Sequence, residues 1–295
     1  MKKIALILFM LGSLVARAQT LEDYFEIAAD QNPGLKAKYK EFEAALEKIP
    51  QVSSLPDPTF SFGYFISPVE TRVGPQRARF SLTQMFPWFG TLKAQNNAAA
   101  LWAEAKHQAF LEARNKLYFQ VSAAYYPLYE WQKWQEIEAK NIKLLETYKT
   151  LATSRFENAK GPMVDVLRAD LLLKDAQTNL EILQTKGIAL RAAFNQLLNR
   201  PVSDPVAMAE TLTTSPIYTA FDKDSLLTSH PLLTEMDLKM RASEANANAA
   251  YRQSLPKLGV GLDYVMVGQR QDVVMPDNGK DVLMPMVSVS IPIFR

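Results

Sequence analysis

Side chains able to carry enzymatic chemistry are sparse in this sequence of 295 residues. It contains two histidines and no cysteine. His107 falls within a long helical pattern and His230 precedes a proline at a helix start, so the two imidazoles are far apart along the chain. The sequence has no Ser/His/Asp or Cys/His arrangement, no phosphate-binding loop and no zinc-ligand spacing, and its acidic residues recur at helical surface spacing. We therefore expect no catalytic residues, no metal centre and no cofactor, and predict that the protein is not an enzyme.

The thioether sulfur of methionine is the other atom type with distinctive chemistry here. Five methionines are candidates for soft copper or silver contacts in a metal exporter, namely Met163, Met266, Met275, Met284 and Met286. Methionine is also a common filler of irregular gaps between apolar side chains. Both interpretations, metal contact and packing, remain open at this point.

The N-terminus predicts a secretory signal peptide over residues 1–18. Lys2 and Lys3 precede an apolar run, and Ala16-Arg17-Ala18 supplies a small-residue cleavage site. The run is too short for a membrane anchor, which needs about 20 apolar residues. No later stretch is long and apolar enough for a transmembrane helix. The net charge of +2 gives no electrostatic footprint for nucleic acid, so we expect no nucleic-acid partner.

Most of the remaining chain has helical periodicity. Residues 21–49 predict a helix that is interrupted at Asn32-Pro33-Gly34 and stopped by the segment 50–58. Two long helical runs follow, about 92–157 and 166–199, with a bend at 158–162, where Gly161 would end one helix and Pro162 begin the next. Gly187 is the one gap in the second run, and Pro127 lies inside the first. Both runs carry a sustained heptad seam typical of long coiled-coil helices, whose residues are Leu117, Val121, Ala124, Leu128 and Trp131, then Ala169, Leu173, Ala176, Leu180, Leu183, Leu190, Phe194 and Leu197.

Two segments change from helical to alternating periodicity. In each, apolar residues alternate with small or polar ones, which predicts two β-hairpins with one apolar face each. We expect polar loops at 67–78 and 268–281. The alternating apolar residues are Phe60, Phe62, Tyr64 and Ile66, then Phe80, Leu82 and Phe86, then Leu258, Val260, Leu262 and Tyr264, then Val287, Val289 and Ile291.

The order of elements occurs twice. Asn32-Pro33 is echoed by His230-Pro231 and Pro58 by Pro256, both 198 positions apart (231 − 33 and 256 − 58). The chain thus predicts a signal peptide at 1–18, a first repeat at 19–200, a linker at 201–221 and an incomplete second repeat at 222–295. The first repeat continues into a long helical hairpin, so we expect that the second copy of this hairpin is missing from the sequence.

This layout resembles the outer membrane efflux protein (TolC-like) family. The resemblance covers residues 21–295, and the order of its motifs carries it more than any single one. The motifs are Asn32-Pro33-Gly34-Leu35, Pro58-Thr59-Phe60-Ser61-Phe62-Gly63-Tyr64, Gln84-Met85-Phe86-Pro87-Trp88-Phe89-Gly90, the bend Arg155-Phe156-Glu157-Asn158-Ala159-Lys160-Gly161, and Asp165-Val166-Leu167-Arg168-Ala169. The Phe86 to Gly90 segment is more similar to the heavy-metal efflux branch than to the drug or protein-export branches.

The resemblance implies an α+β membrane protein with long helical hairpins and four transmembrane strands per chain. It implies a homotrimer in the outer membrane of a Gram-negative bacterium, with a twelve-stranded β-barrel and a periplasmic α-barrel. It also implies passive conduction together with a periplasmic adaptor and an inner-membrane transporter of the RND type. The family's pore-closing acidic residues lie on the second helical hairpin, so none can be assigned here.

Three sets of residues receive roles in this interpretation. The strands would face outer-membrane lipid through Phe60, Phe62, Tyr64, Leu258, Val260 and Leu262. Phe86, Trp88 and Phe89 would form an aromatic belt at the membrane interface, or else cap a hydrophobic core. The helical bend would dock the adaptor through Glu157, Asn158, Lys160, Gly161 and Pro162, or else only reverse the chain. The alternative for the whole chain is a secreted or periplasmic coiled-coil scaffold without transport activity.

Overall fold

The computed structural model describes residues 20–212, 223–272 and 274–293. The predicted signal peptide at 1–18 lies outside the described residues. The chain divides into two compact units that are discontinuous in sequence. The first combines the N-terminal segment up to Lys38 with Phe110–Phe221, and the second combines Tyr39–Ala109 with Asp222–Arg295. None of the helices in the described ranges is both long and apolar enough to cross a membrane.

The predicted break between the first two helices is confirmed. Helix α2 (Leu21–Gln31) begins with a capping box, in which the Thr20 hydroxyl and the Asp23 carboxylate each accept a backbone N–H of the other residue. Asn32 ends α2, and its side-chain oxygen accepts the Leu35 N–H at 3.1 Å, which starts α3 (Pro33–Ser53). Helix α3 continues through Pro50 and ends at Ser53, which lies inside the segment 50–58 predicted to stop it.

The first unit is built on two long helices, α5 (Met163–Leu197) and the part of α4 (Thr91–Glu157) that begins at Phe110. The predicted heptad seam is confirmed, since all of its residues are buried or half-buried. Three aromatic rings with no exposed surface form its centre, Tyr24, Tyr125 and Phe194. The Tyr24 and Phe194 centroids lie 5.0 Å apart at 86°, the edge-to-face arrangement that aromatic pairs favour.

The gap in the seam at Gly187 has a steric reason. A Cβ atom at this position would lie only 2.0 Å from Cζ2 of Trp131 on α4. The indole instead occupies the space and donates from Nε1 to the Leu183 carbonyl at 2.6 Å. The expectation that Gly187 permits a close neighbour is therefore confirmed, and Trp131 is that neighbour.

Polar side chains bind the segment after α5 to the aromatic core. The Tyr24 hydroxyl donates to the Ala207 carbonyl and accepts the Ala207 N–H, at 3.0 and 2.9 Å. The Tyr125 hydroxyl accepts the Ala209 N–H at 3.1 Å. The fully buried Asn195 amide donates to the carbonyls of Val202 and Asp204. This part of the predicted linker is thus a packed element of the first unit.

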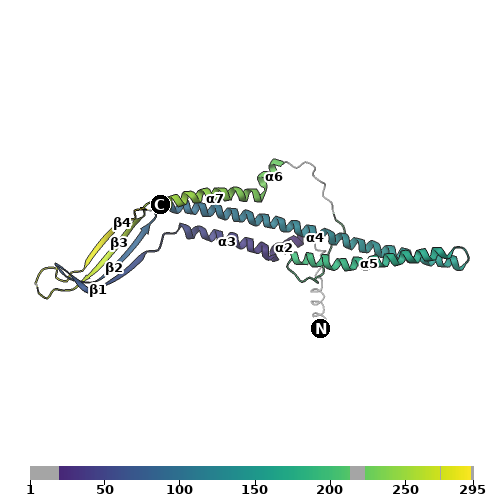
Figure 1. Ribbon diagram of the computed structural model, residues 1–295, viewed down its shortest axis with the longest axis horizontal. Coiled ribbons are helices and arrows are strands. Elements are labelled where there is room, and N and C mark those ends of the chain that lie inside the picture. The colour runs from purple at the N-terminus through teal and green to yellow at the C-terminus, as the bar shows by residue number, and fades with distance from the viewer. Residues whose placement is uncertain (1–19, 213–222, 273, 294–295) are drawn as a thin grey trace, which may run out of the picture. The chain divides into compact units, whose positions relative to one another are not determined.

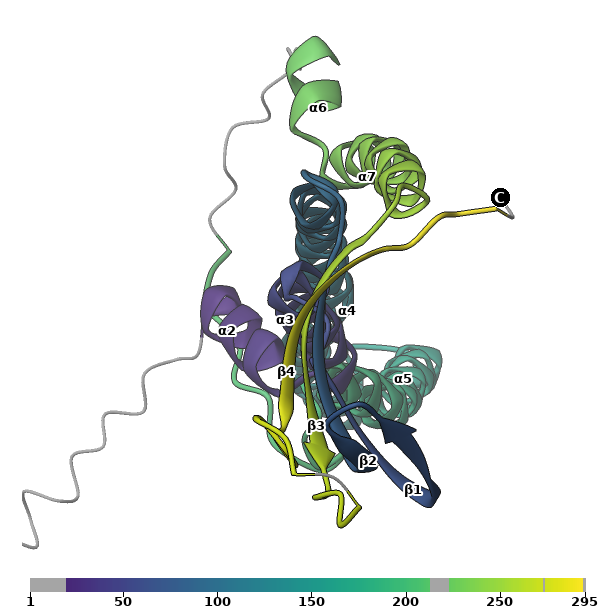
Figure 2. The same ribbon diagram turned by 90° about the vertical axis from the view of Figure 1, so that its left-hand side faces the viewer.

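The second unit contains a four-stranded antiparallel sheet in the order β1-β2-β3-β4 (Figures 1 and 2). Its strands are β1 (Thr59–Thr71), β2 (Gly74–Phe86), β3 (Leu258–Val267) and β4 (Val282–Val289). The loop predicted at 268–281 is confirmed. The loop predicted at 67–78 is wrong, because β1 and β2 continue to a tight turn at Gly74, whose φ is 134°.

The echo between Asn32-Pro33 and His230-Pro231 reflects equivalent local structure. A short helix α6 (Lys223–Ser229) precedes α7 (Pro231–Gln253), which begins with proline as α3 does. Nδ1 of His230 accepts the Leu232 N–H at 3.2 Å, so this imidazole caps a helix. Where β2 leads into α4, Gly90 has a φ of 79°, and its missing Cβ leaves room for the Arg252 guanidinium at the end of α7.

Candidate functional site

One face of the sheet is almost entirely apolar and exposed. The register aligns alternate residues of the four strands on this face, as in the row Phe60, Leu82, Leu262 and Pro285. Exposure is high, at 59% for Phe62 and 80% for Val287. Gln84 is the one polar member within the aligned rows, whose residues are Phe60, Phe62, Tyr64, Ala78, Phe80, Leu82, Gln84, Phe86, Leu258, Val260, Leu262, Tyr264, Met266, Leu283, Pro285, Val287 and Val289. All six strand residues predicted from sequence therefore share one face, with Leu258 half-buried and the other five exposed.

The opposite face carries small and polar side chains. Ser61, Ser81 and Thr83 lie there with Gly259 and Gly261. Arg79 forms an ion pair with Asp263, whose side chain has no exposed surface. Only Oδ2 of Asp263 is engaged, since Oδ1 is buried and has no hydrogen-bond partner. The sheet thus has one face suited to a nonpolar medium and one suited to water or polar solutes.

The three aromatic residues predicted at the membrane interface lie together at the end of β2. Phe86 and Trp88 are about equally exposed, and Phe89 is exposed at 77%. The Trp88 and Phe89 rings pack against each other, with centroids 6.0 Å apart. Phe89 is mostly exposed, whereas Phe86 and Trp88 keep most of their surface covered.

The bend between α4 and α5 closes differently from the prediction. Ala159, with a φ of 56°, takes the left-handed position after α4, and the Lys160 N–H bonds to the Arg155 carbonyl at 2.7 Å. This is the Schellman pattern, in which glycine is the usual left-handed residue. The assignment of that position to Gly161 is therefore wrong. Pro162 precedes α5 as its N-cap residue instead of opening the helix.

The predicted docking residues gather at this bend, and four of the five are exposed, with Gly161 half-buried. The Asn158 amide is engaged locally, since it donates to the Ser154 carbonyl at 2.7 Å. Sequence reasoning missed the apolar part of the surface. Phe156, Met163, Val164 and Leu167 are between 43% and 52% exposed at the same bend. No local pattern in the sequence distinguishes these side chains from the other apolar positions of the two helices.

A small hollow of about 140 Å³ lies inside the bend. It is lined by Arg155 and Lys160 together with Tyr148, Leu151 and Asp165 among others. Further along the hairpin, Lys149 on α4 pairs with Asp170 on α5 at 2.5 Å. The hydrogen bond from Lys149 holds the pKa of the Asp170 carboxyl below its ordinary value. The bend thus combines apolar, cationic and anionic groups.

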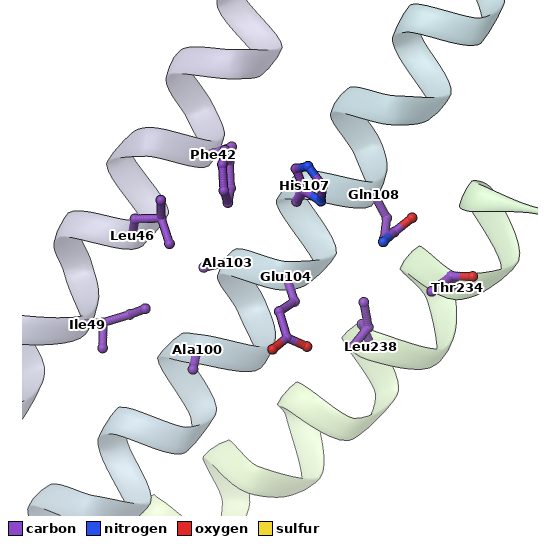
Figure 3. Close-up of a pocket in the computed structure, with 10 residues that line it drawn as sticks. All are labelled: Phe42, Leu46, Ile49, Ala100, Ala103, Glu104, His107, Gln108, Thr234 and Leu238. Carbon is purple, nitrogen blue, oxygen red and sulfur yellow. The ribbon is translucent and has the colours of Figure 1, made fainter.

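The second unit also contains a groove of about 480 Å³ between α3, α4 and α7 (Figure 3). Apolar side chains form most of its lining, and its polar members are Glu104, His107 and Gln108 from α4 and Thr234 from α7. The His107 ring packs against Phe42, with centroids 5.0 Å apart. This contact supports a structural role for His107.

The five candidate methionines do not form one group. Met266 lies on the apolar face of the sheet, Met163 at the helical bend and Met275 in the loop between β3 and β4, whereas Met284 and Met286 share the polar face. Met85, which the sequence did not single out, lies on that polar face as well. Within the described ranges, no three His, Cys, Asp or Glu side chains are grouped to hold a metal ion.

Comparison with known proteins gives matches to solved structures alone. No family model matches the sequence, and no curated protein is significantly similar to it. One match is CusC, whose crystal structures concern the conformational changes that accompany folding and transmembrane channel formation. It aligns with a TM-score of 0.66 and 14% identity over 96% of this chain and 70% of that chain. VceC, an outer membrane protein of Vibrio cholerae, aligns with a TM-score of 0.64 and 18% identity over 93% of this chain and 69% of that chain. The CmeC outer membrane channel of Campylobacter jejuni aligns with a TM-score of 0.64 and 14% identity over 93% of this chain and 61% of that chain.

These structures define the class of fold, a four-stranded sheet joined to long helical hairpins as found in outer-membrane channels. The chain has this TolC-like fold, so the predicted combination of long helices and four strands per chain is confirmed. It spans between 61% and 70% of the length of the six similar solved chains. At identities of 14% to 20% the likeness extends to the fold and no further.

Proposed function

We propose that this chain is the outer-membrane channel of a tripartite efflux pump, that it conducts substrates passively from the periplasm to the exterior, and that it is not an enzyme. The observation that carries the proposal is the continuous exposed apolar face of the sheet. Monomeric soluble proteins rarely expose large contiguous apolar patches. Strands of about 9 to 11 residues cross a bilayer when tilted by about 45°.

The same sheet requires partner copies of the chain. Its outer strands β1 and β4 each have one unpaired edge in the single chain, and open edges are not tolerated in lipid. A closed barrel needs about eight or more strands. Three copies of the four-stranded sheet give twelve strands. We therefore propose a homotrimer in the outer membrane of a Gram-negative bacterium, with β1 of one copy paired with β4 of the next.

The helical bend is the proposed contact with a periplasmic adaptor, which links the channel to an inner-membrane transporter of the RND type. Its exposed mixture of apolar and charged side chains suits a protein partner better than solvent alone. Lys160→Glu combined with Gly161→Ala should leave membrane assembly intact and lower pump-dependent resistance. Lys174→Glu on the exposed surface of α5 is the matched charge control. Resistance that falls equally in both variants, or in neither, would remove the docking role.

Extraction from the cell envelope tests the channel against the coiled-coil scaffold. A barrel inserted in lipid should remain in the membrane fraction through high salt and alkaline carbonate and be released by detergent. A scaffold should be released by the washes. Release of the full-length protein by carbonate would overturn the proposal.

A further inference from the structure

The polar face of the sheet carries a repeated pairing of sulfur and oxygen atoms that the channel proposal does not use. Three successive rows cross strands β2, β3 and β4. They are Met85, Gly259 and Ser288, then Thr83, Gly261 and Met286, then Ser81, Asp263 and Met284. Each row contains one thioether and at least one side-chain oxygen. We name this group the thioether rows.

The two glycines in the middle of the rows let the flanking side chains meet over β3. A Cβ at Gly259 would lie 2.6 Å from the Met85 sulfur and 2.2 Å from the Ser288 hydroxyl oxygen. A Cβ at Gly261 would lie 3.0 Å from the Thr83 hydroxyl and 3.5 Å from the terminal methyl of Met286. The Met85 sulfur and the Ser288 oxygen are 4.0 Å apart across the strand. Any larger residue on β3 would separate these groups.

A second and independent observation comes from Asp263. This carboxylate has no exposed surface, and its Oδ1 has no hydrogen-bond partner, although a buried oxygen left unpaired is costly. Arg79 engages the other oxygen, Oδ2. Met284 lies directly opposite Asp263 in the register. An electron-pair donor with no partner therefore lies in the same rows as the three sulfurs.

We propose that the thioether rows bind a soft monovalent cation of the Cu(I) or Ag(I) class. Thioether ligands select such ions, whereas hard cations such as Na⁺, Mg²⁺ and Ca²⁺ favour sites made wholly of oxygen. The Arg79–Asp263 pair is neutral overall, which favours one added positive charge over two. Methionine has three rotatable bonds, so each thioether can turn toward an ion that contacts the side-chain oxygen of its own row.

The site deepens the proposed channel function, on which it rests, by naming a substrate class. In the proposed barrel the polar face lines the lumen, because the apolar face contacts lipid. An ion leaving through the duct would then pass three thioethers in each copy of the chain. Several weak sites in series suit conduction, which requires that an ion can enter each site and also leave it.

Silver binding to the detergent-extracted full-length protein tests this inference. Titration with Ag⁺ in a chloride-free buffer with excess Na⁺ would compare the wild type with a variant carrying Met85→Leu, Met284→Leu and Met286→Leu. Leucine keeps a similar volume and removes the sulfur. Met266→Leu is the matched control, because Met266 is an exposed methionine on the apolar face of the same sheet.

The expected result is a loss of at least tenfold in Ag⁺ affinity in the triple variant and unchanged affinity in Met266→Leu. Equal affinity in the wild type and the triple variant would overturn the inference, as would an equal loss in Met266→Leu. Carbonate extraction of the same samples separates the two proposals. Membrane retention without silver binding leaves the channel and removes the site, whereas release by carbonate with intact silver binding removes the channel and keeps the site on the sheet.

Discussion

The aromatic core of the first unit and the sheet of the second unit treat their large apolar side chains in opposite ways. The first unit places Tyr24, Tyr125 and Phe194 where they have no exposed surface, and it satisfies the hydroxyls of both tyrosines with backbone partners. The second unit leaves Phe62 and Val287 more than half exposed on a regular sheet. The first is an ordinary core shielded from solvent. The second is organised for a nonpolar medium outside the chain, which is the physical basis for placing it in a membrane.

Charge on the apolar face gives the largest expected effect. Phe62→Arg or Val260→Arg would place a guanidinium in the hydrocarbon region and weaken insertion by about 2 to 4 kcal/mol for each site near the midplane. The measurement is the fraction of protein folded into lipid vesicles across a denaturant titration. Ser61→Arg is the control, since Ser61 adjoins Phe62 on β1 and faces the other way. Normal assembly of both apolar-face variants would remove the contrast between the units.

Two glycines, one in each unit, sharpen the comparison. Gly187→Ala would force a Cβ into the Trp131 ring and should lower the free energy of unfolding of the first unit by about 1 to 3 kcal/mol. Gly63→Ala in β1 should be close to neutral, because no atom lies within 4 Å of its missing Cβ. Chemical denaturation followed by tryptophan fluorescence reports the first effect through Trp131. Equal stabilities of the two variants would mean that the first unit is not tightly packed.

Removing one hydroxyl tests the polar contacts of the first unit. Tyr24→Phe keeps the ring and removes both hydrogen bonds to Ala207, so the cost should be about 1 to 3 kcal/mol, since a buried carbonyl loses its partner. Tyr129→Phe is the control, because its bond to Glu210 is exposed and longer, at 3.4 Å. Thermal unfolding of each variant gives the difference. A larger loss in Tyr129→Phe would contradict the assignment of the core.

Acidification should have the smallest effect of these changes, and it should act on the stability of the helical hairpin formed by α4 and α5. The pKa of Asp170 is lowered in the folded protein by Lys149, so this ion pair contributes stability above the ordinary carboxyl pKa of about 4. The contribution is lost as the pH falls through the lowered value. The thermal unfolding temperature of wild type and Asp170→Asn should therefore differ slightly near neutral pH and converge in strong acid. A difference in unfolding temperature that grows in acid would contradict this assignment of the ion pair.

How well the sequence predicted each part depends on how local its determinants are. The alternation of Phe60, Phe62 and Tyr64 specifies one face of a strand, because the side-chain period of a strand is two. The heptad seam likewise predicted the buried face of α5. The left-handed residue after α4 was assigned to Gly161, yet Ala159 takes it, because backbone bonds that close the turn override the preference for glycine.

Long-range pairings were not accessible from the sequence. The bonds between Tyr24 and Ala207 join positions 183 residues apart, and no local pattern encodes them. The same holds for Met85, which joins Met284 and Met286 only through the register of three strands. The apolar residues at the bend, such as Phe156 and Met163, read as part of the helical periodicity until their exposure was known.

The central claim is that several copies of the chain close their sheets into one barrel. Native mass spectrometry of the full-length protein, extracted in detergent from its own membranes, counts these copies directly. The account predicts three chains per particle, held together until the detergent is removed by heating or denaturant. A particle of one or two chains would contradict it, because four or eight strands from this sheet would not form the proposed twelve-stranded barrel.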